Sequence, residues 1–359
     1  MRILPHLRVL LALLLVAITA HSAELDVESL INNGHWKRAR SLAEEVFRAK
    51  PNDARANYWM ARVRRQFKVL DDAVKYAASA VRLDPKVSAY HRELARVYFD
   101  QIESASVFSA IALAKKSRAE LDTARELAPN DPAILYDQVL FFQQVPGMAG
   151  GDKHRATQLA NSLLQIDPAR GYQALAYIAR QERHEDQLGE LFQKAIEANP
   201  RDYDAQINFA NYYLSPAQLN GKVAEQQALA ALALNADRVE GYRVLTAALI
   251  YQKRYDAAAE MLRHAEIAIP DDLSPYVSAA RALLREGANL STSEAWLQKY
   301  LNESKEPEPT APPFAAVHWS LGLVFEKLGR TGDAKRELET ALRLNPEFEP
   351  AREDLKRFK

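Results

Sequence analysis

The chain has 359 residues, of which 48% are hydrophobic and 26% charged, the balance of a globular protein that can bury a sizeable core. Lysine and arginine together number 47, as do aspartate and glutamate, so the global charge does not favour nucleic-acid binding. Because the sequence contains no cysteine, it excludes disulfides, thiol catalysis, cysteine zinc sites and an acylated lipoprotein cysteine.

The N-terminus has the residue order of a secretory signal. Arg2 and Arg8 come before the apolar run Val9–Ala20, and small residues follow up to Ala23. The run is shorter than the ~20 residues that span a bilayer as a helix. We therefore predict a cleavable signal peptide over residues 1–23 and a periplasmic or secreted mature chain. A membrane anchor formed by the uncleaved N-terminal segment is the alternative.

From residue 25 onward the sequence repeats itself, and nearly every unit ends at a proline. These markers are Pro51, Pro85, Pro129, Pro168, Pro200, Ala236 in place of proline, Pro270, Pro307 and Pro346. Twelve residues before each marker lies a position that is usually alanine: Ala39, Ala73, Ser117, Ala156, Leu188, Ala224, Ala258, Ala295 and Ala334. Such regular spacing indicates internal repeats. It predicts one repeat domain over 24–359, with units at about 25–53, 54–87, 88–131, 132–168, 169–202, 203–238, 239–272, 273–312 and 313–348.

Four of these units depart from the regular pattern, and the sixth does so by an enlarged turn over Ser215–Gly221. The third carries extra residues over Ile102–Ser109, which we expect to lengthen the turn and the start of the second helix. The fourth has an enlarged turn, Val145–Asp152, where three glycines and a proline oppose helix formation. Asp152 is expected to cap a helix over Lys153–Ile166. The eighth ends in the acidic, proline-rich stretch Glu303–Pro313, which predicts an exposed linker.

The ninth unit shows a pair of amphipathic helices most clearly. Leu321, Phe325 and Leu328 lie on one face of the first helix, which Gly329 is expected to end. A second apolar stripe runs from Asp333 to Leu344. Neither helix can bury its stripe alone, so the pair needs neighbouring units to pack against.

The characteristic residues of this unit are His318, Leu321, Gly322 and Phe325 in the first helix, Ala334 and Leu338 in the second, and Pro346 after it. The unit resembles the tetratricopeptide repeat (TPR), whose pattern is W-x2-L-G-x2-Y, A-x3-F and P. The resemblance implies an all-α fold, an α-solenoid that forms a right-handed superhelix of about nine helix-turn-helix units. A C-terminal helix over 349–359 would cap it. The turn sequence PGMAGG is also similar to a group of uncharacterised secreted bacterial TPR proteins, which brings no known activity.

The sequence gives little support for catalysis. It has no H-E-x-x-H, no G-x-S-x-G, no Walker loop and no G-x-G-x-x-G, and no two histidines are spaced i, i+4. We therefore predict no catalytic residue, no metal site and no cofactor. His91 and His318 fall at the leading aromatic position of the repeat, where a packing role is expected. The glycines of Val145–Asp152 are interpreted as a structural turn and not as a phosphate cradle.

A basic stripe is the main candidate for binding. By the TPR resemblance, first-helix residues opposite the packing face line the concave groove. In units two and three these positions hold six candidate peptide-binding residues, Arg55, Tyr58, Arg62, Arg65, Arg92 and Arg96. Because arginine grips carboxylates with two parallel hydrogen bonds, the stripe predicts a site for an acidic peptide segment or chain terminus. A solvated charged face, with Glu93, Asp71 and Asp72 as neighbours, is the alternative.

Farther along the chain, Tyr177, Arg180, Asn211, Arg243 and Arg281 fall at equivalent groove positions and indicate no single chemistry. The sequence as a whole predicts a non-catalytic scaffold outside the cytoplasm that binds a protein or peptide partner in its groove. A component that binds an envelope polymer or small ligand through aromatic residues such as Tyr58 and Phe99 is the alternative. An enzyme with an unfamiliar site is the least favoured interpretation.

Overall fold

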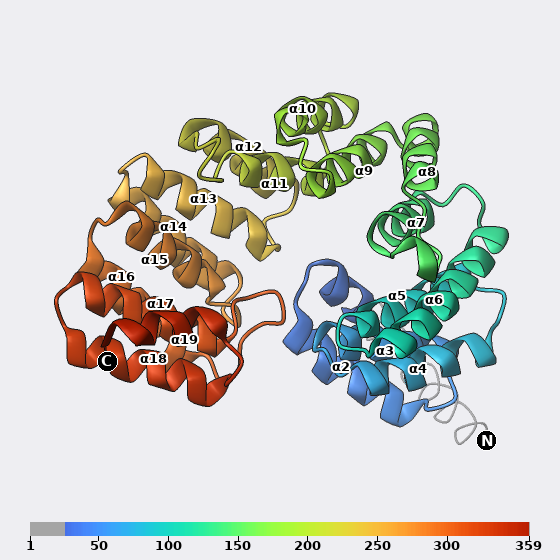
Figure 1. The fold of residues 1–359 in the computed structure, drawn as a ribbon, viewed down its shortest axis with the longest axis horizontal. Coiled ribbons are helices and arrows are strands. Elements are labelled where there is room, and N and C mark those ends of the chain that lie inside the picture. The colour runs from blue at the N-terminus through green and yellow to red at the C-terminus, as the bar shows by residue number, and fades with distance from the viewer. Residues whose placement is uncertain (1–25, 359) are drawn as a thin grey trace, which may run out of the picture. The chain divides into compact units, whose positions relative to one another are not determined.

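The structure is a computed structural model that describes residues 26–358, so the predicted signal segment 1–23 lies outside the described residues. Over residues 26–358 the chain consists of helices and turns and contains no strand (Figure 1). The prediction of an all-α fold is therefore confirmed. The helices fall into two compact units, the first ending at Glu185 and the second beginning at Asp186.

The first unit begins with a helical segment at 26–32 and continues with hairpins of paired helices. Its further elements are α2 (Trp36–Ala49), α3 (Ala54–Gln66), α4 (Leu70–Leu83), α5 (Ser88–Ile102), α6 (Val107–Leu127), α7 (Pro132–Gln144), the 3₁₀ turn η1 (Gly147–Ala149), α8 (Lys153–Ile166) and α9 (Pro168–Gln181). The extra residues of the third repeat mostly lengthen α6, as expected.

The second unit has the same construction. A 3₁₀ turn, η2 (Glu185–Gln187), leads into it. Its elements are α10 (Leu188–Ala198), α11 (Tyr203–Tyr212), α12 (Gly221–Leu234), α13 (Val239–Tyr251), α14 (Tyr255–Ala268), α15 (Ser274–Glu286), α16 (Leu290–Glu303), α17 (Phe314–Lys327), α18 (Thr331–Leu344), α19 (Glu349–Leu355) and η3 (Lys356–Phe358). No helix over residues 26–358 is both long and apolar enough to cross a bilayer.

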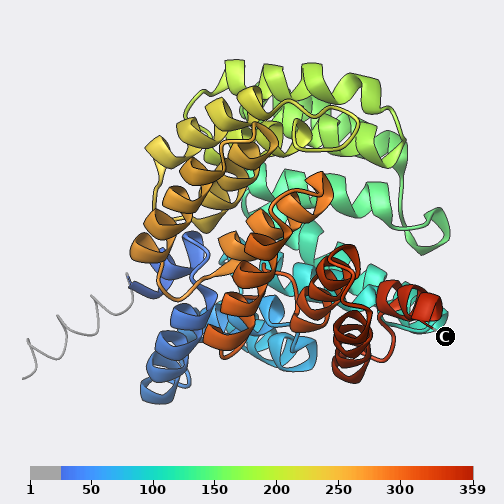
Figure 2. The same ribbon diagram turned by 90° about the vertical axis from the view of Figure 1, so that its left-hand side faces the viewer.

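Within each unit the helices pack on their neighbours in the sequence (Figures 1 and 2). The two helices of a hairpin contact each other closely, as α5 does α6 and α17 does α18. The first helices of consecutive hairpins also touch, so that α3, α5 and α7 are in contact in the first unit, and α13, α15 and α17 in the second. Contacts limited to near neighbours are what a solenoid of stacked repeats requires, and they confirm this fold class.

The small residues predicted at the helix crossings are buried with no exposed surface in most hairpins, namely at Ala39, Ala73, Ser117, Ala156, Ala224, Ala258 and Ala334. The eighth hairpin differs, because Ala295 is exposed there. Ser293 is the fully buried small residue in α16, and its hydroxyl donates to the carbonyl oxygen of Ala280 at 2.8 Å. The register predicted from Pro307 is therefore wrong by two residues, because α16 ends at Glu303 and Pro307 lies in the longer connection to α17.

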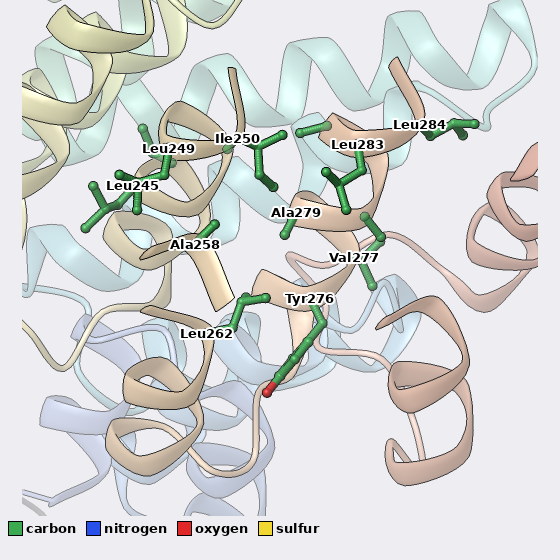
Figure 3. Packing of buried hydrophobic residues seen from close by; sticks show 14 of the residues in the cluster. Leu245, Leu249, Ile250, Ala258, Leu262, Tyr276, Val277, Ala279, Leu283 and Leu284 are labelled. Carbon is green, nitrogen blue, oxygen red and sulfur yellow. The ribbon is translucent and has the colours of Figure 1, made fainter. Parts of the chain in front are cut away.

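The core of the second unit shows how these hairpins hold together (Figure 3). Leu245 and Ile250 of α13, Leu262 of α14, and Val277 and Leu283 of α15 are all at most 1% exposed. Their side chains meet between the three helices, as Figure 3 shows. A cluster of this kind is built by three consecutive helices, so no single hairpin could bury it alone.

The enlarged turn of the fourth hairpin is structural, as predicted. Asp152 caps α8, because its carboxylate accepts a hydrogen bond from the backbone nitrogen of Arg155 at 3.0 Å. A Cβ on Gly151 would lie 1.6 Å from the carbonyl oxygen of Val145, so only glycine fits this position.

The prediction of an exposed linker over Glu303–Pro313 is wrong at its centre, since Glu308 is only 3% exposed.

Candidate functional site

The predicted stripe residues belong to α3 and α5, and we call the faces of these helices that carry them the first-helix surface of the first unit. This surface includes the neighbouring face of α7, because side chains of α5 reach it. It consists of ion pairs that join one first helix to the next. The five arginines of the stripe therefore do not present five free charges.

Arg65 is the most deeply engaged of them. Its Nε donates to Oε1 of Glu93 at 2.6 Å, and its Nη1 lies 3.5 Å from Oδ2 of Asp100. Arg65 is 8% exposed and Glu93 3% exposed. Burial alone would raise the pKa of Glu93, but the charges of Arg65 and Arg96 outweigh it and hold this pKa below its ordinary value. The pair is thus ionised at neutral pH and joins α3 to α5.

Arg92 and Arg62 are also paired with carboxylates. Nε of Arg92 donates to Oδ2 of Asp137 on α7 at 2.7 Å. Nη1 of Arg62 donates to Oε1 of Glu28 at 2.8 Å, in the helical segment before α2. Both acids lie in neighbouring repeats, and neither was expected as a partner from the sequence. Asp71 and Asp72 were the acids expected beside the stripe. They accept hydrogen bonds from Gln101 and Lys75 instead.

The aromatic residues of this surface are packed on other rings. The ring centroid of Tyr58 lies 5.1 Å from that of Tyr90, and that of Phe99 lies 6.2 Å from that of Phe141. The guanidinium of Arg55 lies 4.8 Å from the ring centroid of Trp59. Tilted ring pairs of this kind contribute to packing between hairpins.

Arg96 differs from the other stripe arginines. It lies 3.8 Å from carboxylate oxygens of both Glu93 and Asp137, and its side chain is 37% exposed. Burial, followed by the positive charge of Arg65, lowers the pKa of Arg96 below its usual value. It borders a small cavity of about 130 Å³, lined also by Phe99, Leu121 and Phe141 among others. No described carboxylate lies within hydrogen-bond distance of Arg96, so its guanidinium keeps donors that a ligand could use.

The two histidines at the leading aromatic positions each contact the second helix of their own hairpin. Nδ1 of His91 lies 2.6 Å from Oε2 of Glu120, and Nδ1 of His318 lies 2.7 Å from Oε2 of Glu337. This is the packing role that the repeat register predicts. In the part of the chain that the structure describes, no group of three or more His, Cys, Asp or Glu residues could hold a metal ion.

One hairpin of the chain matches a known family. Residues 315–348 match the family model of the tetratricopeptide repeat. The matched residues cover the hairpin α17–α18, whose pattern carried the resemblance in the sequence. At this hairpin the TPR resemblance is therefore supported. No curated protein matches the chain.

Several solved helical-repeat structures are similar to the chain. A thermophilic TPR protein of Thermus thermophilus is 19% identical, covers 55% of this chain and 100% of its own, and has a TM-score of 0.48. Yeast Tom70 is 11% identical, with 95% of this chain and 88% of its own covered and a TM-score of 0.49. A tetratricopeptide repeat protein from Parabacteroides merdae is 15% identical. The match covers 94% of this chain and 97% of that protein, with a TM-score of 0.38.

Proposed function

We propose that this protein is a non-catalytic scaffold that binds peptide segments of partner proteins on its first-helix surfaces. The observation that carries the proposal is that side chains bridge consecutive first helices. Arg65 of α3 reaches Glu93 of α5, and Arg92 of α5 reaches Asp137 of α7. The first helices of a unit therefore present one continuous polar face that extends across several hairpins. A face of that kind suits an extended peptide better than a small substrate.

Within the first unit, Arg96 and the cavity beside it are the best-placed part of the predicted stripe. A guest carboxylate would add a charge-assisted hydrogen bond to Arg96 without breaking an existing one. An apolar guest side chain fits the small cavity next to Phe99 and Leu121. Arg55, Tyr58, Arg62, Arg65 and Arg92 would support this contact by fixing the surface around it.

The proposal is tested by selecting a random peptide library on the immobilised chain from residue 24 onward. We expect peptides that bind the folded chain and do not bind the heat-unfolded chain. Failure to enrich any peptide above the background of an unrelated helical protein would overturn the scaffold function. Binding constants are then measured by fluorescence anisotropy with the individual labelled peptides.

The contribution of the first unit is tested on the same peptides with Arg96→Gln. Peptides that use this surface should lose about tenfold in affinity, because one charge-assisted hydrogen bond is removed. Arg82→Gln is the matched control, since Arg82 is exposed on the second helix α4. If every selected peptide is indifferent to Arg96→Gln, the stripe of the first unit is a solvated structural face.

We also propose that the chain acts outside the cytoplasm, in the periplasm or after secretion, on the strength of the signal-like order of residues 1–23. The N-terminal sequence of the protein purified from its own cells tests this. We expect it to begin close to Glu24. A chain that retains Met1 would point instead to an uncleaved segment, as in the membrane-anchored alternative.

A further inference from the structure

The second unit carries three arginines that no acidic side chain neutralises. Arg243 lies on α13, and Arg281 and Arg285 lie about one turn apart on α15. Nε of Arg243 donates to Oγ of Ser278 at 3.3 Å, and Nη1 of Arg285 donates to the hydroxyl of Tyr251 at 2.5 Å. Across residues 26–358, none of the three arginines is within ion-pair distance of a carboxylate.

Arg281 is the least satisfied of the three. It makes no hydrogen bond from its side chain within the described range, and its guanidinium lies 5.9 Å from the ring centroid of Trp319 on α17. Burial, and then the positive charges of Arg285 and Arg243, lower the pKa of Arg281 below its usual value. Arg281 is therefore close enough to the other two arginines to be repelled by them, and an anion beside Arg281 would relieve that repulsion.

A groove lies beside two of these arginines, Arg281 and Arg285. Its volume is about 410 Å³, and its walls come from α15, α17 and the C-terminal turn η3. Its lining includes Arg281, Leu284, Arg285, Trp319, Leu323 and Arg357.

The acidic groups at this groove are already bound. Nη2 of Arg357 donates to Oε2 of Glu326 at 2.6 Å, and Nη1 of Arg357 donates to Oδ1 of Asp354 at 2.5 Å. Oδ2 of Asp354 also accepts a hydrogen bond from Nε1 of Trp319 at 2.7 Å. Neither acid is free to turn toward Arg281 without giving up these bonds. The groove therefore keeps a positive wall formed by Arg281 and Arg285.

We propose that this groove binds an acidic segment of the partner peptide, with its carboxylates held by Arg281 and Arg285 and a neighbouring apolar side chain on Trp319. Arg243 adds positive charge from the adjacent helix. The inference rests on the proposed scaffold function and names the chemistry of the guest and the place where it is recognised. The guest is recognised on the second unit, whereas the sequence predicted a binding site at the basic stripe of the first unit.

The apolar walls favour a peptide over a free phosphate. Leu284 and Leu323 line the groove with Trp319, and their surface stabilises a ligand that carries apolar groups beside its charges. A peptide with glutamate or aspartate next to leucine or an aromatic residue has both the negative charge and the apolar group. Inorganic phosphate would use the arginines and leave the apolar walls in water.

The experiment uses the peptides selected on the chain from residue 24 onward and a double variant, Arg281→Gln with Arg285→Gln. We expect the selected peptides to be enriched in aspartate and glutamate beside apolar residues. Their affinity for the double variant should fall about tenfold or more, because the charged donors are lost. The affinity for the wild-type chain should also fall as salt is raised. A control double variant, Arg48→Gln with Arg82→Gln, removes two exposed arginines from second helices and should bind normally.

Three outcomes would overturn the inference while leaving the scaffold function intact. Selected peptides could lack acidic residues, or they could bind the double variant as tightly as the wild type. Inorganic phosphate or pyrophosphate could compete at the arginines while acidic peptides fail to bind there, which would assign the groove to a phosphate-bearing ligand. If no peptide is selected at all, the scaffold function itself is wrong.

Thermal unfolding separates a binding role from a structural one. Removing Arg281 relieves repulsion and breaks no hydrogen bond, so Arg281→Gln should leave the melting temperature unchanged or raise it at low salt. A structural arginine would show a clear fall in melting temperature. Such a fall for Arg281→Gln would contradict the assignment of this side chain to a ligand.

Discussion

Arg92 and Arg243 fall at equivalent positions of their repeats, but they face different partners. Arg92 meets the carboxylate of Asp137 on the next first helix at 2.7 Å. Arg243 meets the hydroxyl of Ser278 on the next first helix, which carries no charge. The charge of Arg92 is therefore neutralised within the fold, whereas Arg243 has no carboxylate within ion-pair distance among the described residues. The facing side chain thus decides whether the arginine at this position of the repeat is paired with a carboxylate.

Arg65 provides the clearest residue-scale prediction. Arg65→Gln should destabilise the chain by about 3 kcal/mol at neutral pH, because it leaves Glu93 buried and charged without its partner. The folded-state pKa of Glu93 lies below its ordinary value of 4.5. The pair therefore contributes stability above that pH and loses it as the pH falls through the lowered pKa. The difference in stability between variant and wild type should shrink as the pH falls below 4.5 and through the lowered pKa of Glu93.

Urea denaturation followed by circular dichroism at neutral and at acid pH measures this difference. Arg82→Gln serves as the control, since Arg82 is exposed on α4 and its replacement should cost little at either pH. An equal loss of stability for Arg65→Gln at both pH values would show that the ion pair with Glu93 is not the cause.

At the scale of the elements, hairpin positions and caps could be predicted from the sequence, because they depend on short-range signals. Asp152 capping α8 is such a case. The partners of the stripe arginines could not be predicted, because repeat register gives the face of a residue but not what it meets. Asp137 lies 45 residues from Arg92, and Glu28 lies 34 residues from Arg62. The sequence predicted Arg281 as a groove residue but not Arg285. The spacing of four residues, which places both on one face of α15, would have been enough to include Arg285.

Close helix contacts lead to a prediction about glycine at the element scale. A Cβ at Gly171 of α9 would lie 2.6 Å from the backbone nitrogen and 2.8 Å from the Cα of Leu164 on α8. Gly171→Ala should therefore force the two helices apart and lower stability by about 1 to 3 kcal/mol, despite the better helix propensity of alanine. The midpoint of thermal unfolding measures this loss.

Gly332 of α18 is the matched control for this substitution. The nearest atom to a Cβ there is Nη1 of Arg336, at 3.8 Å. Gly332→Ala should leave stability unchanged or raise it by up to about 1 kcal/mol. If both alanine variants behave alike, the close approach of α8 and α9 does not constrain residue 171.

At the scale of the whole molecule, the formal charge of zero conceals an uneven use of arginine. In the first unit three arginines of the first helices, Arg62, Arg65 and Arg92, are paired with Glu28, Glu93 and Asp137 respectively. In the second unit Arg281 and Arg285 have no acidic partner among the described residues, and a groove lies beside them. Each unit is a stack of hairpins with its first helices in contact, so a guest can bind along that face without disturbing the core.

We propose that a peptide guest lies on the first helices. A selected peptide that carries a photoreactive benzoylphenylalanine, crosslinked to the chain and mapped by mass spectrometry, tests this claim most directly. The crosslinks are predicted to fall on α13, α15 and α17, next to Arg281 and Trp319, and to disappear with Arg281→Gln and Arg285→Gln together. Crosslinks confined to the second helices α14, α16 and α18 would contradict the account.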